Sequence, residues 1–343
     1  MPGKSTRHGM PVELRLDAVH PDSIERSLAT RRGEIDRLLD ARGALLLRGI
    51  GGGSAAEFAR ILDSLGTPGG GSDGHWATGL PRESFGVVAG LSSRHSVPMH
   101  QDLTLAGEPV ERIALYCETA AVSGGDIVIA DSRAAAAAID PELRARLEAG
   151  RPVLRVTLAG PREDSQDAPG WSRILGTRRM TEAERRARSL GWQVRWLADG
   201  AMEIRRALPA LRPHPRSGEM LFCFPAHLHA PAAVLRWISR DGRTVDWLRT
   251  LAACIDAPER MDEVFLADGT PLSDEDAERL YDAFVDCETP VRLRRGDLLL
   301  LDGRLAVHGR TAFAGPRRVH GAAFLAGNAA RWTAAPAEAL AEA

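Results

Sequence analysis

The 343-residue sequence lacks any long run of apolar residues, and its charges are balanced. No apolar stretch approaches the ~18 residues that a transmembrane helix needs, so we expect no membrane association. The first residues carry charge but no apolar run follows them, which predicts no signal peptide and a cytoplasmic location. The formal net charge is −2 without a long block of one sign, so we expect no nucleic-acid partner.

Lysine and cysteine are also scarce. Lys4 is alone among 44 basic residues and the others are arginine, which together with the many alanines indicates a GC-rich bacterial coding bias. The four cysteines form no Cys-x-x-Cys pair, and this spacing argues against a structural zinc site or a disulfide framework. We therefore expect reduced, buried side chains at Cys117, Cys223, Cys254 and Cys287.

Short apolar runs separated by loops and helical patterns predict an α+β fold with a mainly β core. Strands are expected near residues 43–49, 112–117, 126–130, 153–158, 218–224, 291–294, 298–301 and 319–325. Helical patterns cover 23–41, 55–65, 132–147, 181–190 and 274–286, with N-caps at Ser54 and Ser273. The turn sequence Val122–Gly125 favours a hairpin between 112–117 and 126–130, and the glycine-rich stretch 66–74 predicts a loop. No composition break marks a second domain.

The candidate site is a set of two histidines and one carboxylate. Such a triad binds iron(II) on one face and leaves the opposite positions open for other ligands. His100 and Asp102 are separated by one residue, and the distant His308 would complete the set. The His-x-Asp triplet alone is weak evidence because His20-Pro-Asp22 has the same form, although Asp22 precedes a helical pattern and fits a helix cap.

A second histidine cluster, His227-Leu-His229, suggests a different metal site. On a strand, residues two apart share a face, so both histidines could bind a metal together with a third partner such as His214. That arrangement would indicate a zinc hydrolase. The alternative is that the two histidines line a loop that follows Pro225.

The segments around the first triad decide between these alternatives. Six of them stand in one characteristic order: Pro98–Asp102, Pro109 with Leu115–Cys117, Gly124–Arg133, His214–Glu219, Arg295–Asp302 and Val307–Arg318. Together they resemble the taurine dioxygenase/clavaminate synthase-like superfamily of iron(II)- and 2-oxoglutarate-dependent oxygenases. The resemblance runs from about residue 30 to 326 and is closest to the branch with the syringomycin-pathway aspartyl hydroxylase and the arginine hydroxylases.

The resemblance implies a distorted double-stranded β-helix, or jelly roll, with flanking and inserted helices. It implies one oxygenase domain over 1–343, with a core at about 30–326 and peripheral residues at 1–20 and 328–343. It also implies iron(II) held by His100, Asp102 and His308, with 2-oxoglutarate and O2 as the two cosubstrates. An arginine after the distal histidine would hold the far carboxylate of 2-oxoglutarate through two parallel hydrogen bonds. By the motif this is Arg318, with Arg317 as the alternative.

Three positions bear on how the cosubstrate binds, on the class of substrate and on the type of reaction. Ile127 stands where many relatives have a threonine that gives 2-oxoglutarate a second hydrogen bond, so another donor must serve or the cosubstrate binds more weakly. Ala322 stands where taurine-type enzymes carry a second arginine, which argues against a small sulfonate substrate held in that manner. Asp102 is present, whereas halogenases of the superfamily have a small residue there, so hydroxylation is the expected reaction.

The expected function is therefore hydroxylation of an unactivated C–H bond, with release of succinate and CO2. The resemblance indicates an amino acid or an amino-acid-derived natural-product intermediate as substrate, either free or tethered to a carrier protein. Desaturation or cyclisation by the same cofactors is one alternative, and a non-catalytic jelly-roll binding protein is another. The candidate substrate contacts are His95, just before the metal motif, and His227 and His229, because in the family that stretch lies beside the substrate pocket.

Overall fold

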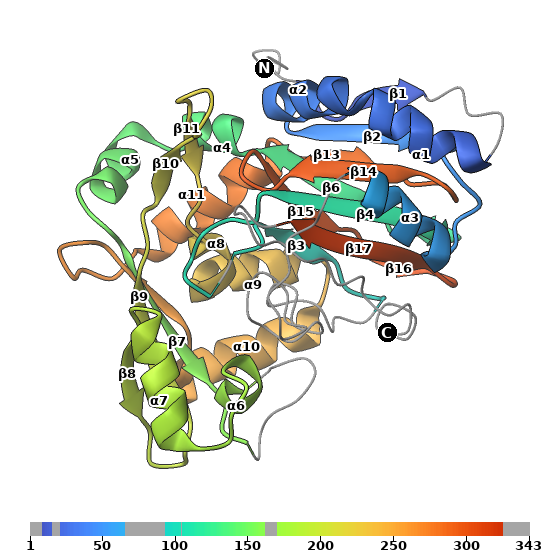
Figure 1. The fold of residues 1–343 in the computed structure, drawn as a ribbon. Helices are drawn as coiled ribbons and strands as arrows, with labels where there is room; N and C mark the ends of the chain where they lie inside the picture. Colours follow the sequence, from blue (N-terminus) through green and yellow to red (C-terminus); the bar gives the residue numbers. More distant parts are fainter. Residues whose placement is uncertain (1–8, 16–20, 66–92, 104, 162–169, 325–343) are drawn as a thin grey trace.

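A computed structural model describes residues 9–15, 21–65, 93–103, 105–161 and 170–324. The described chain is a mixed α+β structure in which most strands pair in antiparallel ladders (Figure 1). The predicted loop at 66–74 lies outside the described residues. In the part of the chain that the structure describes, no helix combines the length and the apolar character needed to span a bilayer.

The larger sheet gathers strands from both ends of the chain, in the order β1-β2-β14-β4-β17. The β1–β2 pair is parallel and the other three pairs are antiparallel. The strands are β1 (Val12–Arg15), β2 (Ala44–Arg48), β14 (Leu298–Asp302), β4 (Arg112–Thr119) and β17 (Arg318–Phe324). One face of this sheet is covered by the helices α1 (Pro21–Thr30), α2 (Arg32–Arg42) and α3 (Ala55–Leu65).

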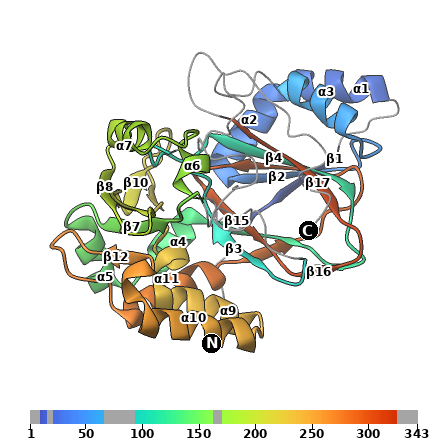
Figure 2. The same cartoon turned by 90° about the horizontal axis from the view of Figure 1, so that it is seen from below.

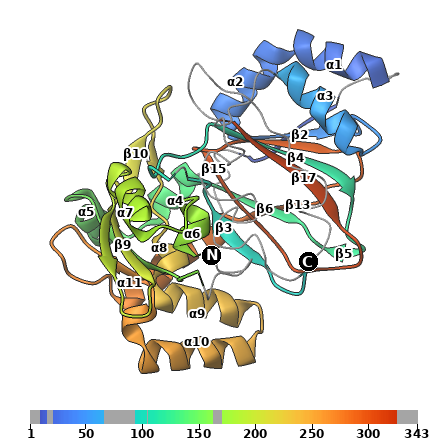
Figure 3. The ribbon, with the colours of Figure 1, turned by 60° about the horizontal axis from the view of Figure 1, so that its bottom comes forward.

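A second, fully antiparallel sheet lies against the other face, in the order β13-β6-β15-β3 (Figure 3). Its strands are β13 (Thr289–Val291), β6 (Ile127–Asp131), β15 (Ala306–Arg310) and β3 (Val97–His100). Successive side chains of β2 point to opposite faces of the larger sheet, so one apolar run packs against both the helices and the second sheet. Leu45 and Leu47 pack against the helices, while Leu46 packs into the core between the two sheets, where Ile129 meets it from the other side.

Helices cover the outer face of the second sheet and separate it from a peripheral layer. They include α4 (Ser132–Ala138), α8 (Ala226–His229), α9 (Pro231–Arg240) and α11 (Asp274–Val285), and α10 (Thr244–Asp256) packs on α9 (Figure 2). The peripheral layer is the sheet β12-β7-β9-β8 with its own apolar core. Its elements are β12 (Glu263–Phe265), β7 (Val153–Leu158), β9 (Met202–Ala207), β8 (Gln193–Trp196), α6 (Trp171–Ile174) and α7 (Met180–Ser189).

Short elements complete the described chain. Two small ladders pair β10 with β11 and β16 with β5. The remaining bounds are α5 (Pro141–Glu148), β10 (Leu211–Pro213), β11 (Met220–Phe222), β5 (Ser123–Gly124), β16 (Phe313–Ala314) and a 3-10 turn at Pro258–Arg260.

The hairpin predicted across Val122–Gly125 is wrong. Strand β4 lies in the larger sheet between β14 and β17, whereas β6 lies in the second sheet between β13 and β15. The chain crosses from one sheet to the other here because Gly124 and Gly125 both adopt positive φ angles, of 63° and 71°. A Cβ on Gly124 would lie 2.0 Å from the carbonyl oxygen of Ala312, so this crossing requires glycine.

The predicted helices are confirmed, but two of them are broken. Ser54 and Ser273 cap their helices as expected, since Ser54 accepts from the Glu57 amide at 3.2 Å and Ser273 accepts from the Asp276 amide. The 132–147 pattern forms α4 and α5, because Asp140 starts a new helix with a proline at its first position. The 23–41 pattern similarly forms α1 and α2.

The cysteine prediction is half right. None of the four cysteines forms a disulfide, and Cys117 and Cys223 are buried. Cys254 and Cys287 are only partly buried, which corrects the expectation for those two. Burial raises the pKa of the Cys117 thiol to about 11, so at neutral pH this side chain stays a thiol within the core.

Candidate metal centre

The two histidines of the candidate triad come from neighbouring strands of the second sheet. His100 is the last residue of β3 and His308 is the third residue of β15, and the antiparallel register places them directly opposite one another. Their ring centroids are 4.5 Å apart. Paired residues of a ladder share a face, and Ile129, the partner of His308 on β6, belongs to the core between the sheets. The histidines therefore face the space between the two sheets.

Asp102 follows β3 and turns its carboxylate between the two rings. Its Oδ1 lies 3.8 Å from His100 Nε2, and its Oδ2 lies 3.8 Å from His308 Nε2. One atom from each residue can be chosen so that all three lie within 4.8 Å of one another. Among the described residues, no other group of three or more histidine, cysteine, aspartate or glutamate side chains shows this convergence.

All three side chains are withdrawn from water, with exposures of 4% for His100, 1% for Asp102 and 7% for His308. Neither carboxylate oxygen of Asp102 accepts a hydrogen bond from a described residue, and burial raises the pKa of this group well above its usual value. A buried carboxylate without donors is costly unless a cation compensates it. Burial also lowers the pKa of both imidazoles, which keeps them neutral, and neutral histidine is the form that binds a metal. The donor set thus fits a divalent metal ion.

Backbone contacts fix the orientation of these side chains. His100 Nδ1 lies 3.0 Å from the carbonyl oxygen of Pro98. Because a carbonyl only accepts, Nδ1 must carry the proton, which leaves the lone pair of Nε2 toward Asp102. The Gln101 amide donates to the carbonyl of Arg304 at 2.8 Å, and this bond ties the turn after β3 to the turn before β15.

The two candidate cosubstrate arginines point to different sides of the larger sheet. Arg318 pairs with Glu118 at 3.1 Å and its side chain is 40% exposed. Arg317 is more buried. Its Nε donates to the carbonyl of Gly125 at 3.2 Å, and it lines a small cavity together with Cys117, a residue of the core between the sheets. Burial lowers the pKa of Arg317. The geometry therefore favours Arg317, the alternative from the motif, over Arg318.

The histidines proposed as substrate contacts do not converge. His95 lies 3.9 Å from an Asp246 carboxylate oxygen on α10, and His229 contacts Asp262 at 2.7 Å. His227 is on helix α8 rather than a strand or a loop, and its Nε2 lies 2.6 Å from the Met99 carbonyl oxygen.

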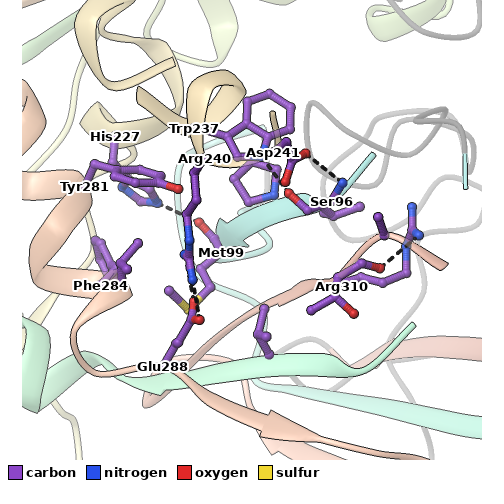
Figure 4. A pocket seen from close by; sticks show the side chains of 16 residues that line it. Ser96, Met99, His227, Trp237, Arg240, Asp241, Tyr281, Phe284, Glu288 and Arg310 are labelled. Carbon is purple, nitrogen blue, oxygen red and sulfur yellow. Dashed lines mark hydrogen bonds and ion pairs between the residues drawn. The ribbon is translucent and has the colours of Figure 1, made fainter. Parts of the chain in front are cut away.

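Figure 4 shows His227 beside a cavity of about 170 Å³ on the outer face of the second sheet, away from the metal side. Phe284, whose ring centroid is 4.3 Å from that of His227, belongs to the core outside this sheet. The zinc arrangement of His214, His227 and His229 also does not form. His214 is buried, with Nδ1 accepting from the Ser217 amide at 3.2 Å, and it makes no cluster with the other two.

One partly buried cation on the metal strand was not predicted. Arg310 lies two residues after His308 on β15, and it lines the cavity beside His227. His20 of the competing triplet lies outside the described residues.

Comparison with known proteins matches nearly the whole described chain to one protein family. A profile of the taurine catabolism dioxygenase TauD, TfdA family matches residues 11–323. The chain is similar to a clavaminate synthase-like protein of Arabidopsis thaliana, with 27% identity over 308 residues that cover 86% of this chain and 85% of the relative. It is also similar to the dapdiamide synthesis protein DdaC of Enterobacter agglomerans, with 23% identity over 83% of each chain.

Among solved structures, the chain resembles AAD-2 in complex with Mn(II) and N-oxalylglycine. The TM-score is 0.49 and the sequence identity is 14%, over 93% of this chain and 95% of the other.

Proposed function

The chain belongs to the taurine catabolism dioxygenase TauD, TfdA family, and from this premise we propose that it hydroxylates an unactivated C–H bond of an amino-acid-like molecule. It is a dioxygenase that uses iron(II), 2-oxoglutarate and O2, and its family acts on small molecules. The bound iron supplies the oxidising chemistry, with succinate and CO2 as the proposed co-products. The residues of this chain supply binding, orientation and exclusion of water.

We propose that His100, Asp102 and His308 hold the iron. The observation that carries this proposal is the buried carboxylate of Asp102, which lies 3.8 Å from both Nε2 atoms and accepts no hydrogen bond from a described residue. Two neutral imidazoles and one carboxylate are a donor set suited to iron(II), and three protein ligands leave positions for 2-oxoglutarate and O2. The presence of Asp102 favours hydroxylation over halogenation.

We propose that Arg317 binds the far carboxylate of 2-oxoglutarate. Its guanidinium is partly buried and lies at the crossing between β4 and β6, next to Gly125. A planar guanidinium can meet a carboxylate through two parallel hydrogen bonds, and burial strengthens that interaction. Arg318 instead has Glu118 as its partner, so its role is proposed to be structural.

The two facing sheets are proposed to be the halves of a distorted double-stranded β-helix within a single domain. Antiparallel pairing throughout the second sheet, the shared core between the sheets and the crossing at Gly124 and Gly125 support this architecture. The profile match over 11–323 supports one domain rather than two.

The substrate class rests on the sequence resemblance to amino-acid hydroxylases and on the similarity to a protein of dapdiamide synthesis. An amino acid or an amino-acid-derived natural-product intermediate is proposed, either free or bound to a carrier protein. Desaturation or cyclisation is the alternative outcome with the same cofactors. Contacts of His95, His227 and His229 with the substrate stay predictions.

The test is a substrate screen with oxygen-dependent succinate release as the readout, after anaerobic titration with iron(II) and 2-oxoglutarate. Amino acids and their carrier-tethered thioesters form the panel. We expect succinate release that depends on substrate and iron and that is lost in Asp102→Ala. Unchanged release in Asp102→Ala would show that the metal assignment is wrong, and iron binding without turnover on any substrate would favour a binding protein.

A further inference from the structure

Arg206, on β9 of the peripheral layer, contacts the loop that begins at Asp102. The base of this loop is closed, because the Val110 amide donates to the Asp102 carbonyl at 2.9 Å. Farther along the loop, the Leu105 carbonyl accepts from the Arg206 guanidinium at 3.1 Å. Leu105 follows Asp102 by three residues, so their Cα atoms are at most about 11 Å apart. Arg206 is therefore fixed to the loop that carries a proposed metal ligand.

Trp192 and Gly107 hold the Arg206 side chain against this loop. The indole of Trp192 donates to the same Leu105 carbonyl at 3.2 Å, and the guanidinium carbon of Arg206 lies 5.2 Å from the centroid of the indole. Gly107 allows the loop to approach closely, because a Cβ there would lie 2.4 Å from Leu208 Cδ2 and 3.2 Å from Arg206 Nη2. The guanidinium is therefore oriented by contacts on two sides.

The charge of Arg206 is not compensated within the described chain. Arg206 is partly buried, no described carboxylate forms an ion pair with it, and the Leu105 carbonyl accepts one of its five N–H groups. Burial lowers its pKa to about 10, so it stays charged at neutral pH. A partly buried cation without a counter-ion raises the energy of the folded protein, and a bound anion lowers it. The nearby Arg212 differs, because it pairs with Glu108.

We propose that Arg206 binds the carboxylate of the substrate, so that the substrate is a free acid rather than a thioester on a carrier protein. A guanidinium can meet a carboxylate through two parallel hydrogen bonds, whereas a thioester carries no negative charge to compensate it. The inference rests on the proposed function, because it assumes that an amino-acid-like substrate reaches the metal beside this loop. It decides between the free and the tethered form of that substrate.

The experiment starts from the succinate-release screen, run on L-amino acids, their carboxamides and their carrier-tethered thioesters. Each amino acid that supports release is titrated by calorimetry, alongside its carboxamide, into protein loaded with Mn(II) and 2-oxoglutarate. The proteins compared are the unaltered chain, Arg206→Gln, Arg206→Lys and Arg205→Gln. Arg205 is the exposed neighbour on β9 and lies 3.5 Å from a Glu203 carboxylate oxygen, so its variant controls for the loss of one positive charge.

We expect Arg206→Gln to weaken amino-acid binding about 10- to 100-fold, the effect of losing a hydrogen bond to a charged group. Carboxamide binding should be unchanged, Arg206→Lys should be intermediate, and Arg205→Gln should match the unaltered chain. If Arg206→Gln does not fold, the ratio of the two affinities in Arg206→Lys decides, and it should fall toward one.

Three results would overturn the inference. These are equal weakening of the acid and the carboxamide, which would show a structural role, no weakening of either, and succinate release from carrier-tethered thioesters alone. Absence of succinate release with every compound of the panel would instead overturn the proposed function, and this inference with it.

Discussion

His100 and His308 lie directly opposite each other across the β3–β15 ladder, with their ring centroids 4.5 Å apart. The two ligands come from distant parts of the chain, so strand register alone brings them together. Register fixes which side chains share a face, and a slip of one residue would turn one histidine away from the other. The metal site is therefore sensitive to any change in how these two strands pair.

Gly309→Ala tests this dependence on strand pairing. A Cβ at this position would lie 2.4 Å from the Val97 carbonyl oxygen and 3.0 Å from the Met99 amide nitrogen, so the strands must separate. We expect a loss of about 1–3 kcal/mol in the free energy of unfolding, as for other overpacked sites. Metal affinity should fall at least about tenfold, because the orientation of His308 changes. Thermal unfolding and metal titration measure the two effects.

Gly321→Ala is the matched control for that variant. Gly321 lies on β17, and a Cβ there would meet only the Leu115 side chain at 3.5 Å, an ordinary contact. Its metal affinity should equal that of the unaltered chain. Equal metal affinity for Gly309→Ala and the unaltered chain would contradict the dependence on register.

Asp102→Asn tests whether the buried Asp102 carboxylate destabilises the metal-free protein. Burial raises the pKa of Asp102 well above 3.8, so the folded metal-free protein retains a proton that the unfolded chain releases near that pH. The contribution of this group to stability is therefore lost as pH rises from about 4 toward the raised folded pKa. Asparagine carries no charge, so metal-free Asp102→Asn should gain stability relative to metal-free protein as pH rises.

The measurement is the melting temperature against pH, with and without Mn(II). We expect the variant to melt above the unaltered metal-free chain at pH 8, and to show no stabilisation by Mn(II). The unaltered chain should be stabilised by the metal in proportion to RT ln(1 + [L]/Kd). A variant that Mn(II) still stabilises fully would contradict the role of Asp102.

Arg317→Ala and Arg318→Ala separate the two candidate cosubstrate arginines. Arg317 points inward and lines the cavity beside Cys117, so its removal should weaken 2-oxoglutarate binding about 10- to 100-fold. Arg318 pairs with Glu118 at the surface, so its removal should cost about 0–1 kcal/mol of stability and leave cosubstrate binding unchanged. Calorimetric titration of 2-oxoglutarate distinguishes them. The reverse order of effects would restore Arg318, the residue first expected from the motif.

The comparison of Arg317 with Arg318 shows that a local sequence motif does not predict the direction in which a side chain points. The motif places an arginine after the distal histidine, but the side to which each one points depends on an irregularity in the β4–β17 ladder between Arg318 and Val319. Such a register shift depends on how the strands pair in the folded protein, and the spacing of residues in the motif does not reveal it. The metal triad was easier to predict because its signal lies in residue type and in neighbouring motif segments.

Sheet assignment was the other feature that the sequence could not supply. The turn residues of Val122–Gly125 predicted a hairpin between two strands, but a hairpin and a crossing between sheets use the same residues, and the chain crosses between the sheets here. The helix caps at Ser54 and Ser273 were predictable because a cap is a contact within three residues. His227 lies neither on the strand nor in the loop that the sequence suggested, because its segment forms the short helix α8.

His227→Phe tests whether this histidine contacts the substrate or supports the metal strand. Its Nε2 lies 2.6 Å from the Met99 carbonyl oxygen, directly before His100, and burial lowers its pKa to about 4, so it is neutral and donates from Nε2. Removing the donor leaves a buried carbonyl unpaired, at a cost of about 1–3 kcal/mol. We expect a lower melting temperature and weaker metal binding, with an unchanged KM for the substrate once the metal is saturating.

His229→Gln is the comparison, since His229 contacts the partly exposed Asp262 at 2.7 Å and lies on the same short helix. It should leave metal affinity unchanged and lower stability by about 1 kcal/mol or less. A raised KM in His227→Phe at saturating metal, with unchanged metal affinity, would instead mean that the substrate reaches the outer face of the second sheet. In that case the cavity beside His227 would belong to the substrate site, and the space between the sheets would hold only the metal and 2-oxoglutarate.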